Sequence, residues 1–242
     1  MTLPQKISNL PIEKGVISKP DVLIRMVDVV KVYPGRSGPV KALKGINLEI
    51  GRGEFWVITG RSGAGKTTLV NLLTGLDQVT SGEIWVGDKP VHKFTQEQSA
   101  KWRGQNVGVV FQSFHLIPAL TVIQNITLPM DFASRGTLRQ RNERGLGLLK
   151  QMDIETHAHK FPSQMSGGQQ QRIAIARSLA NDPALLVADE PTGSLDSKTA
   201  QIIFGIFESL AETGKTVIMV THDPDFAKKA RHSLVLDDGA IR

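Results

Sequence analysis

The stretch that decides the fold is Gly60-Arg61-Ser62-Gly63-Ala64-Gly65-Lys66-Thr67, which fits the phosphate-loop pattern G-x-x-x-x-G-K-[ST] at every fixed position. The residues before it, Phe55 to Thr59, are apolar or β-branched and predict a buried strand. The residues after it predict a helix that breaks near Gly75, with leucines at helical spacing, namely Leu69, Leu72, Leu73 and Leu76. A strand, a glycine loop and a helix aim backbone N–H groups and a positive helix end at one point, so we expect an anion there.

Strands and helices alternate on both sides of this loop. The further predicted strands are Val22 to Val30, Ile46 to Ile50, Ile84 to Val86, Val107 to Phe111, Ala184 to Ala188 and Thr216 to Val220. The further predicted helices are Val122 to Ile126 after the cap Thr121, Leu138 to Met152, Ser166 to Ala180 and Asp196 to Glu212. This order predicts an α/β fold with a phosphate-loop core and a mostly parallel sheet. We expect an antiparallel β side sheet from the early strands together with a last hairpin that turns at residues 237–239.

The domain organisation follows from where the patterns change. Residues 1–20 contain three prolines with little periodicity and predict an N-terminal arm. Residues 21–242 predict one domain, and helical patterns indicate a helical subdomain inserted at about residues 113–180. No apolar run approaches the roughly 18 residues that a membrane-spanning helix needs. The first residues also lack the apolar core of a secretory signal.

The composition is that of an ordinary globular protein, with 40% apolar and 21% charged residues. With no cysteine in the sequence, disulfides and thiolate metal sites are excluded. A net charge of +6 permits contact with nucleic acid or an anionic membrane surface, although the basic residues are mostly scattered. The densest group is Arg135, Arg139, Arg141 and Arg144, which we interpret as a solvated helix face in preference to the alternative, an anion-binding patch.

Two adjacent carboxylates, Asp189 and Glu190, end an apolar strand pattern. Neighbouring residues on a strand point to opposite sides, so the two acids should have different roles. In phosphate-loop enzymes the acid at such a strand end serves Mg²⁺, which also takes the loop hydroxyl, here Thr67. We therefore assign Asp189 to the metal and leave Glu190 to orient or deprotonate an attacking water.

The segment Ser166-Gly167-Gly168-Gln169 opens a predicted helix as a capping box, with serine at the N-cap and glutamine three residues later. Two glycines in the first turn cost helix propensity, on the order of 1 kcal/mol each, so something must need the bare backbone. One explanation is a second anion site at the positive helix end, and the other is a tight packing contact. The spacing alone favours neither explanation.

Three other residues occupy places where a ligand could lie. His222 follows an apolar strand and so lies at its carboxyl end, where open α/β sheets bind ligands, and it is a candidate sensor of a terminal phosphate. Gln112 has the same location after another strand and could reach a metal or water through its amide. Tyr33, the only tyrosine, could stack on a base, although an isolated loop aromatic ordinarily packs. His157 and His159 lack a third ligand nearby, which argues against a metal site there.

In order and spacing, these features resemble the nucleotide-binding subunit of ATP-binding-cassette (ABC) transporters, from about Val22 to Arg242. Two positions depart conservatively from the family pattern, Met165 for leucine and Ser194 for alanine. The motifs that carry the resemblance are the adenine-stacking aromatic (Tyr33), the Walker A loop (Gly60 to Thr67), the Q-loop glutamine (Gln112), the signature (Ser166 to Gln169), the Walker B acid (Asp189), the catalytic glutamate (Glu190), the D-loop (Ser194 to Asp196) and the switch histidine (His222).

The resemblance implies an ATPase that binds ATP and Mg²⁺ between two copies packed head to tail. The signature of one copy would close on the γ-phosphate held by the Walker A loop of the other. It places ATP at Tyr33, Gly60, Ser62, Gly63, Ala64, Gly65, Lys66, Thr67, Thr68, Ser166, Gly167, Gly168, Gln169 and Asp196. It places Mg²⁺ at Thr67, Gln112 and Asp189, and it gives the catalytic roles to Glu190 as base, His222 and Gln112.

The resemblance also implies that ATP binding and hydrolysis power a transmembrane permease. In ABC subunits the segment here spanning Phe114 to Leu120 faces the coupling helices of the permease, so a docking groove is expected there. The segment that continues to Met130 is similar to subunits of the lipoprotein-releasing, macrolide-efflux and antimicrobial-peptide-resistance type, which favours export or extrusion. Such a subunit would be cytoplasmic, held at the inner face of the cell membrane through the permease.

A soluble ABC ATPase acting in DNA repair, translation or cofactor assembly is the alternative, and the basic composition gives it some support. Against it, the sequence has one cassette, no long heptad region and no cysteine for zinc. We therefore expect no nucleic acid partner. Because specificity lies in the permease, these residues encode neither the transported substrate nor its direction.

Overall fold

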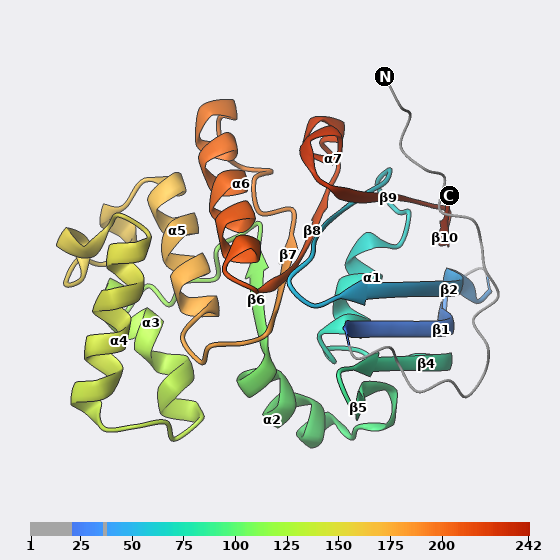
Figure 1. Ribbon diagram of the computed structural model, residues 1–242, viewed down its shortest axis with the longest axis horizontal. Helices are drawn as coiled ribbons and strands as arrows, with labels where there is room; N and C mark the ends of the chain where they lie inside the picture. Colours follow the sequence, from blue (N-terminus) through green and yellow to red (C-terminus); the bar gives the residue numbers. More distant parts are fainter. Residues whose placement is uncertain (1–20, 36–37) are drawn as a thin grey trace.

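The computed structural model describes residues 21–35 and 38–242 (Figure 1), so the arm predicted for residues 1–20 lies outside the described residues. Its framework is a six-stranded sheet ordered β10-β9-β3-β8-β7-β6 and a four-stranded sheet ordered β2-β1-β4-β5. The first sheet is parallel from β9 to β6, and the second is antiparallel throughout. The predicted α/β class, with a mostly parallel sheet and an antiparallel side sheet, is confirmed.

Four strands of the six-stranded sheet are short and mostly apolar, as expected for strands covered on both faces. The strands of this sheet are β3 (Phe55–Thr59), β6 (Val107–Phe111), β7 (Leu185–Asp189), β8 (Thr216–Thr221), β9 (His232–Asp237) and β10 (Ala240–Ile241). The carboxyl ends of the parallel strands β3, β6, β7 and β8 lie at one edge of the sheet, so the residues that follow them meet there.

Two apolar cores lie on the two faces of this sheet. Along β3, Phe55 and Val57 belong to one core, and Trp56 and Ile58 belong to the other. This alternation is the two-residue period of a strand. Because both faces are covered there, β3, β7 and β8 appear in the sequence as nearly continuous apolar runs rather than as an alternation of apolar and polar residues.

The four-stranded sheet packs on the second core through one of its faces. Its strands are β1 (Val22–Tyr33), β2 (Val40–Gly51), β4 (Ser81–Val86) and β5 (Lys89–Pro90). The first two are longer than predicted, because their pairing continues from Val30 opposite Lys44 to Tyr33 opposite Val40. This extension carries Tyr33 to the end of a strand.

The last hairpin does not join the antiparallel sheet, so that prediction is wrong. Strand β9 pairs in parallel with β3, with Trp56 opposite His232, and β10 pairs with β9 at the sheet edge. The physical reason is burial, since Leu234 and Leu236 of β9 enter the second core beside Ile58. The hairpin turn reaches the side sheet through one backbone hydrogen bond, from the Lys44 N–H to the Gly239 carbonyl at 2.8 Å.

The helices begin close to the caps that the sequence indicates, including Thr121, Ser166 and Asp196. They are α1 (Lys66–Leu73), α2 (Gln96–Asn106), α3 (Val122–Phe132), α4 (Leu138–Gln151), α5 (Gly167–Ser178), α6 (Ser197–Glu212) and α7 (Pro224–Lys229). Three short 3-10 turns are η1 (Val91–Lys93), η2 (Glu155–His157) and η3 (Pro162–Gln164). The first helix is shorter than predicted, and Leu76 lies beyond its end with 47% of its surface exposed.

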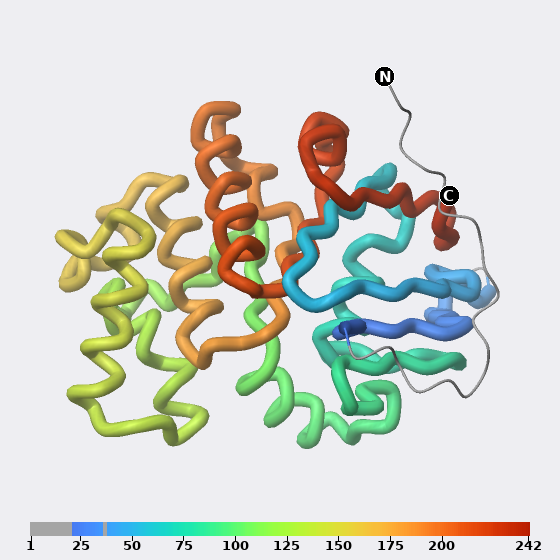
Figure 2. The backbone as a smooth tube through the Cα atoms, in the orientation of Figure 1, coloured from blue at the N-terminus to red at the C-terminus, as the bar shows by residue number. Residues whose placement is uncertain are grey.

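Helices α3, α4 and α5 gather on the side away from the four-stranded sheet, and Figure 2 shows this group as the yellow-green to orange part of the trace. The boundaries of about 113 and 180 for an inserted helical subdomain stay a prediction. Within the part of the chain that the structure describes, no helix combines the length and the apolar character that crossing a membrane requires.

Candidate functional site

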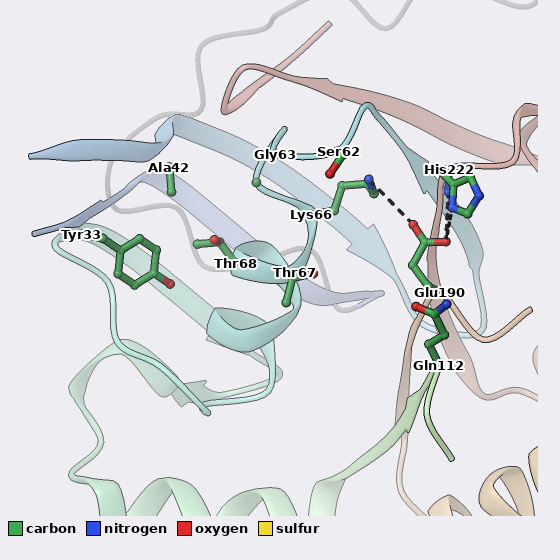
Figure 3. A pocket seen from close by; sticks show the side chains of 11 residues that line it. Tyr33, Ala42, Ser62, Gly63, Lys66, Thr67, Thr68, Gln112, Glu190 and His222 are labelled. Atoms are coloured by element: carbon green, nitrogen blue, oxygen red, sulfur yellow. Dashed lines mark hydrogen bonds and ion pairs between the residues drawn. The ribbon is translucent and has the colours of Figure 1, made fainter. Parts of the chain in front are cut away.

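A pocket of about 460 Å³ opens between the end of β1, the first turn of α1 and the ends of β6, β7 and β8 (Figure 3). The predicted residues that line it are Tyr33, Ser62, Gly63, Gly65, Lys66, Thr67, Thr68, Gln112, Glu190 and His222. The other predicted residues are not among those that line it, and they are Gly60, Ala64, Asp189, Ser166, Gly167, Gly168, Gln169 and Asp196.

Glycines allow the phosphate loop to adopt its shape. Gly65 caps α1 with a φ of 102°, and a Cβ atom there would lie 2.6 Å from the Ala42 carbonyl oxygen. A Cβ atom at Gly60 would lie 2.2 Å from the Leu236 carbonyl oxygen. At Gly63 the φ is 79°, and no described atom lies within 4 Å of the Cβ position. Packing therefore requires glycine at position 60, packing and a positive φ require it at position 65, and the positive φ alone favours it at position 63.

Lys66 brings a buried positive charge to the pocket, with a side chain that is 9% exposed. Its Nζ donates to the carbonyl oxygens of Gly60 at 2.8 Å and Arg61 at 3.1 Å, and it lies 3.8 Å from Glu190 Oε1. Buried ammonium groups need such partners, because desolvation without compensation is costly. The amine is thus held beside the loop backbone, where phosphate oxygens can replace the carbonyl oxygens as its partners.

Asp189 is the last residue of β7 and lies close to Thr67. Burial raises the pKa of Asp189 and the charge of Glu190 adds to the rise, against opposing contributions from the Thr67 hydroxyl and Lys66. Asp189 Oδ1 is buried and accepts no hydrogen bond from the described residues. A buried carboxylate oxygen is costly without a partner, so the Asp189 and Thr67 oxygens form a donor set that fits a hard divalent cation.

Glu190 adopts an uncommon backbone conformation beside His222. Its φ is 50°, in the left-handed region that residues other than glycine rarely occupy. Its Oε2 lies 2.8 Å from His222 Nδ1 and accepts from the His222 backbone N–H at 3.2 Å, while Oε1 faces Lys66. Figure 3 shows the carboxylate between the amine and the imidazole. This carboxylate can accept a proton from a water molecule in the pocket.

Strand register brings Gln112 beside Glu190. Strands β6 and β7 pair in parallel with Phe111 opposite Asp189, so the next residue on each strand leaves the sheet at the same edge. A Cβ atom at Gly193 would lie 2.9 Å from the Gln112 amide nitrogen, so glycine there gives this side chain its space. Together with the pairing of β7 with β8 and of β8 with β3, this register unites three features that are far apart in the sequence: Gln112, the acidic pair and the phosphate loop.

Tyr33 forms the other end of the pocket, beside Thr68 (Figure 3). Its phenol hydroxyl donates to Asp77 Oδ2 at 2.7 Å. Burial raises the pKa of Tyr33 and the bond to Asp77 adds to the rise, so the phenol stays a hydrogen-bond donor at neutral pH. The pocket thus has an aromatic wall at one end and charged groups at the other.

The first turn of α5 lies on the surface, outside the pocket, with Ser166 and Gly167 exposed. The Ser166 side chain accepts from the Gln169 N–H and the Gln169 side chain accepts from the Ser166 N–H, so the predicted capping box is present. A Cβ atom at Gly168 would lie 2.5 Å from Thr199 Cγ2, whereas one at Gly167 would make only ordinary contacts at 3.6 Å or more. Packing on α6 therefore explains Gly168 and leaves Gly167 unexplained.

Three residues at or near these features carried no signal in the sequence. Ala42 lines the pocket beside Gly65, and no pattern marks a single alanine on a strand. Asp77 bonds Tyr33 across 44 positions of sequence, a contact that only the fold creates. His157 Nε2 lies 3.2 Å from the Gln169 amide nitrogen, so this histidine contacts the capping box of α5.

The arginines interpreted as a solvated helix face have partners within the chain. Arg139 pairs with Glu143 at 2.8 Å, and Arg141 pairs with Asp131 at 2.7 Å. Arg135 donates to the Asn181 carbonyl, and Arg144 donates to the Ala180 carbonyl. Three of these four side chains are exposed, yet Arg135, just before α4, and Arg144, within α4, also bond the residues that follow α5.

A parallel sheet with a phosphate loop between β3 and α1, and an acidic pair at the end of β7, two strands away from β3, defines a nucleoside-triphosphate-hydrolysing fold. Residues 43–193, more than half of the chain, match the family described as ABC transporter. The chain therefore belongs to the ABC transporter family, of which it is an ATPase domain, as the sequence motifs predict.

Relatives and solved structures agree with this assignment. Over 221 residues the chain is 43% identical to the macrolide export ATP-binding/permease protein MacB of Syntrophobacter fumaroxidans, a match that covers 90% of this chain and 31% of that protein. Over 223 residues it is 42% identical to the uncharacterized ABC transporter ATP-binding protein MJ0796 of Methanocaldococcus jannaschii, a match that covers 90% of this chain and 95% of that protein. The chain thus spans roughly a third of the length of the MacB relatives that it matches.

Two solved structures of MJ0796 have the same fold. One is described as a dimeric structure of a bacterial ABC transporter cassette, with 42% identity, coverage of 91% of this chain and 97% of that chain, and a TM-score of 0.84. The other is a dimeric post-hydrolysis state bound to ADP and Pi, with 41% identity, the same coverage and a TM-score of 0.84.

Proposed function

We propose that two copies of this chain pack head to tail, enclose ATP between them and use its hydrolysis to drive a membrane permease. The observation that carries this proposal is the separation of two features within one chain. The phosphate loop, Glu190 and His222 share one pocket, whereas the Ser166 end of α5 lies on the surface outside it. A second copy would place its own Ser166 against the nucleotide and complete the site.

Within the pocket, each ATP contact has a physical basis. Backbone N–H groups of the phosphate loop and the positive end of α1 would bind the phosphates, and Lys66 would neutralise their charge. The aromatic ring of Tyr33 would stack on the adenine at the opposite end. Gly167, which packing does not require to be glycine, would bring the bare backbone of the second copy close to the γ-phosphate.

Mg²⁺ would be held by Thr67 and Asp189, with Gln112 nearby. The buried Asp189 Oδ1 that accepts no hydrogen bond from the described residues supports this assignment. When bound, the ion supplies charge that stabilises the phosphate oxygens of the transition state. Glu190 would take a proton from the attacking water as general base, and His222, already bonded to Glu190 at 2.8 Å, would orient this carboxylate and contact the γ-phosphate.

The segment from Phe114 to Leu120 would be the permease docking site. Ile117 is 39% exposed, whereas buried Asn125 bonds the Ile117 backbone N–H at 2.8 Å and carbonyl at 3.1 Å. Arg177 of α5 donates to the carbonyl oxygens of Phe114 and His115. A rigid exposed segment bonded to the signature helix can transmit dimer closure to a bound permease, which would also hold the chain at the inner face of the membrane.

Co-purification of the permease tests this proposal. Tagged chain is extracted in detergent from cells that make it naturally, and membrane proteins that remain bound are identified by mass spectrometry. We expect a permease with the wild-type chain, its loss with Ile117→Asp and its retention with the control Ile202→Asp, which changes an exposed apolar residue of α6. Recovery of nucleic acid with no membrane protein would contradict the proposal.

A further inference from the structure

The ring of Tyr33 is fixed from two sides by Lys31 and Asp77, neither of which lines the pocket. Asp77 Oδ2 accepts from the Tyr33 hydroxyl at 2.7 Å, and Asp77 Oδ1 accepts from Lys31 Nζ at 2.6 Å. The same Lys31 ammonium lies 4.8 Å from the centroid of the Tyr33 ring. One carboxylate thus holds both the edge of the ring and the cation over its face.

These contacts are partly shielded from water, and this shielding strengthens the hydrogen bonds and the cation–π contact. The side chains of Lys31 and Asp77 are 12% and 28% exposed. Burial raises the pKa of Asp77, but hydrogen bonds from Lys31 and Tyr33 outweigh it, and the net pKa is lowered. The carboxylate therefore stays ionised and accepts both bonds at neutral pH.

The backbone around this cluster is also anchored. The Asp77 N–H donates to the Asn71 carbonyl of α1 at 3.1 Å, and Lys31 Nζ donates to the Gln78 carbonyl at 2.7 Å. The Val32 N–H donates to Thr80 Oγ1 at 2.9 Å. The end of β1 is therefore bonded to the loop that follows α1, the helix whose first turn borders the phosphate loop.

We propose that Lys31 and Asp77 are positioning residues for base recognition, which fix the Tyr33 ring at a set distance from the phosphate loop so that its remaining face stacks on the adenine. The inference rests on the proposed stacking role of Tyr33. The Lys31 ammonium over one face is attracted to the ring and so holds it in place. A fixed ring also loses no rotamer freedom when the nucleotide binds, which strengthens binding.

The test compares ADP with ribose 5′-diphosphate, which has the same phosphates and sugar but no base, by calorimetry on the full chain. Both ligands avoid turnover. We expect Asp77→Leu and Lys31→Met to weaken ADP binding about 3- to 10-fold, the range for one partly buried hydrogen bond or cation–π contact, and to leave ribose 5′-diphosphate within about twofold. Asp77→Asn keeps an acceptor for the phenol and should retain more ADP affinity than Asp77→Leu.

A matched control is Asp88→Leu, which removes an aspartate paired with Lys89 at 2.9 Å on the surface and should change neither affinity. Binding of ribose 5′-diphosphate itself reports that each variant is folded. In a Tyr33→Phe background, Asp77→Leu should cost less than in the wild type, because its acceptor no longer serves the phenol.

The outcomes separate the two claims. Equal weakening of both ligands by Asp77→Leu, unchanged ADP affinity, or full additivity with Tyr33→Phe would overturn the positioning role. If Tyr33→Ala weakens ADP alone while Asp77→Leu and Lys31→Met do not, the stacking role stands and the positioning role falls. If Tyr33→Ala has no effect specific to ADP, the stacking role is wrong and the inference falls with it.

Discussion

The phosphate loop and the first turn of α5 use the same device, a glycine-rich helix start, in opposite surroundings. At the loop, Lys66 is 9% exposed and the neighbouring residues form a pocket of about 460 Å³. At α5, Ser166 and Gly167 are exposed and neither lines that pocket. A helix start offers backbone N–H groups to an anion, and because the α5 end lies outside the pocket of its own chain, our proposal gives it a ligand held by a second copy. The comparison supports the proposal that the phosphate loop and the α5 end each provide one half of a nucleotide site, which we call a half-site.

Glu190→Gln should give the largest effect of these variants, a loss of ATP turnover. It changes the pocket and leaves the α5 end as it is. We expect ATP turnover to fall about 10²- to 10⁴-fold, the usual contribution of a general base, while ATP still binds. Sedimentation with Mg²⁺ and ATP should then reveal a stable dimer, because hydrolysis no longer reopens it. Turnover close to wild type would remove Glu190 from the role of base.

Lys66→Ala should disable the pocket at ATP binding, the step that precedes hydrolysis. Losing a buried ammonium that our proposal places against several phosphate oxygens should weaken ATP binding by about 10²-fold or more, since charged hydrogen bonds contribute about 1.5–3 kcal/mol each. Calorimetry measures the affinity, and circular dichroism checks that the chain is folded. An unchanged dissociation constant would contradict the phosphate-loop assignment.

Ser166→Arg, made in the Glu190→Gln chain, should disable the α5 side alone. ATP affinity of the monomer should stay within about twofold, because Ser166 does not line the pocket, while the ATP-induced dimer disappears from sedimentation. Thr137→Arg is the matched control, since Thr137 caps α4 through the same kind of capping box and losing a cap costs about 1 kcal/mol. A dimer that persists in Ser166→Arg but not in Thr137→Arg would reverse the assignment.

Asp189→Asn should give the smallest effect, a change in the stability of the nucleotide-free protein. It should raise that stability rather than lower it. The pKa of Asp189 is raised in the folded chain, so its ionised form lowers stability above that pKa, and removing the charge should stabilise the nucleotide-free protein at pH 7. Each kcal/mol would raise Tm by about 2–4 °C at this chain length.

Scanning calorimetry from pH 7 downwards checks the sign for Asp189→Asn. The Tm difference from wild type should narrow as the pH falls through the raised pKa, because the wild-type carboxyl then becomes neutral in the folded state. A variant that is less stable than wild type at pH 7 would contradict the buried-charge account.

Local patterns predicted most of the fold, because the two covered faces of the parallel sheet produce apolar runs and the helices carry capping residues. The polar helix α2 was missed, since it buries only Ser99 and Trp102 and has no apolar stripe. The last hairpin was misplaced because strand pairing is a long-range choice: Leu234 and Leu236 follow the core rather than the nearest antiparallel strands.

In the candidate site, too, local motifs were predictable from the sequence and long-range contacts were not. The phosphate loop, the acidic pair and the capping box are contiguous in the sequence and could be found there. The bond from Asp77 to Tyr33, the contact of His157 with Gln169 and the approach of Gly168 to Thr199 join residues that are distant in the sequence. No local pattern encodes such contacts, because each depends on how strands and helices pack.

The most direct test of the half-site account is ATP turnover per chain as a function of chain concentration, with saturating ATP and Mg²⁺. If the nucleotide site is completed by the α5 end of a second copy, turnover per chain rises with concentration and levels off as the dimer fills. Excess Ser166→Arg chain carrying Lys66→Ala, which lacks both halves, should leave this curve unchanged. Turnover per chain that stays constant over about a hundredfold dilution, with the chain monomeric in ATP, would contradict the account.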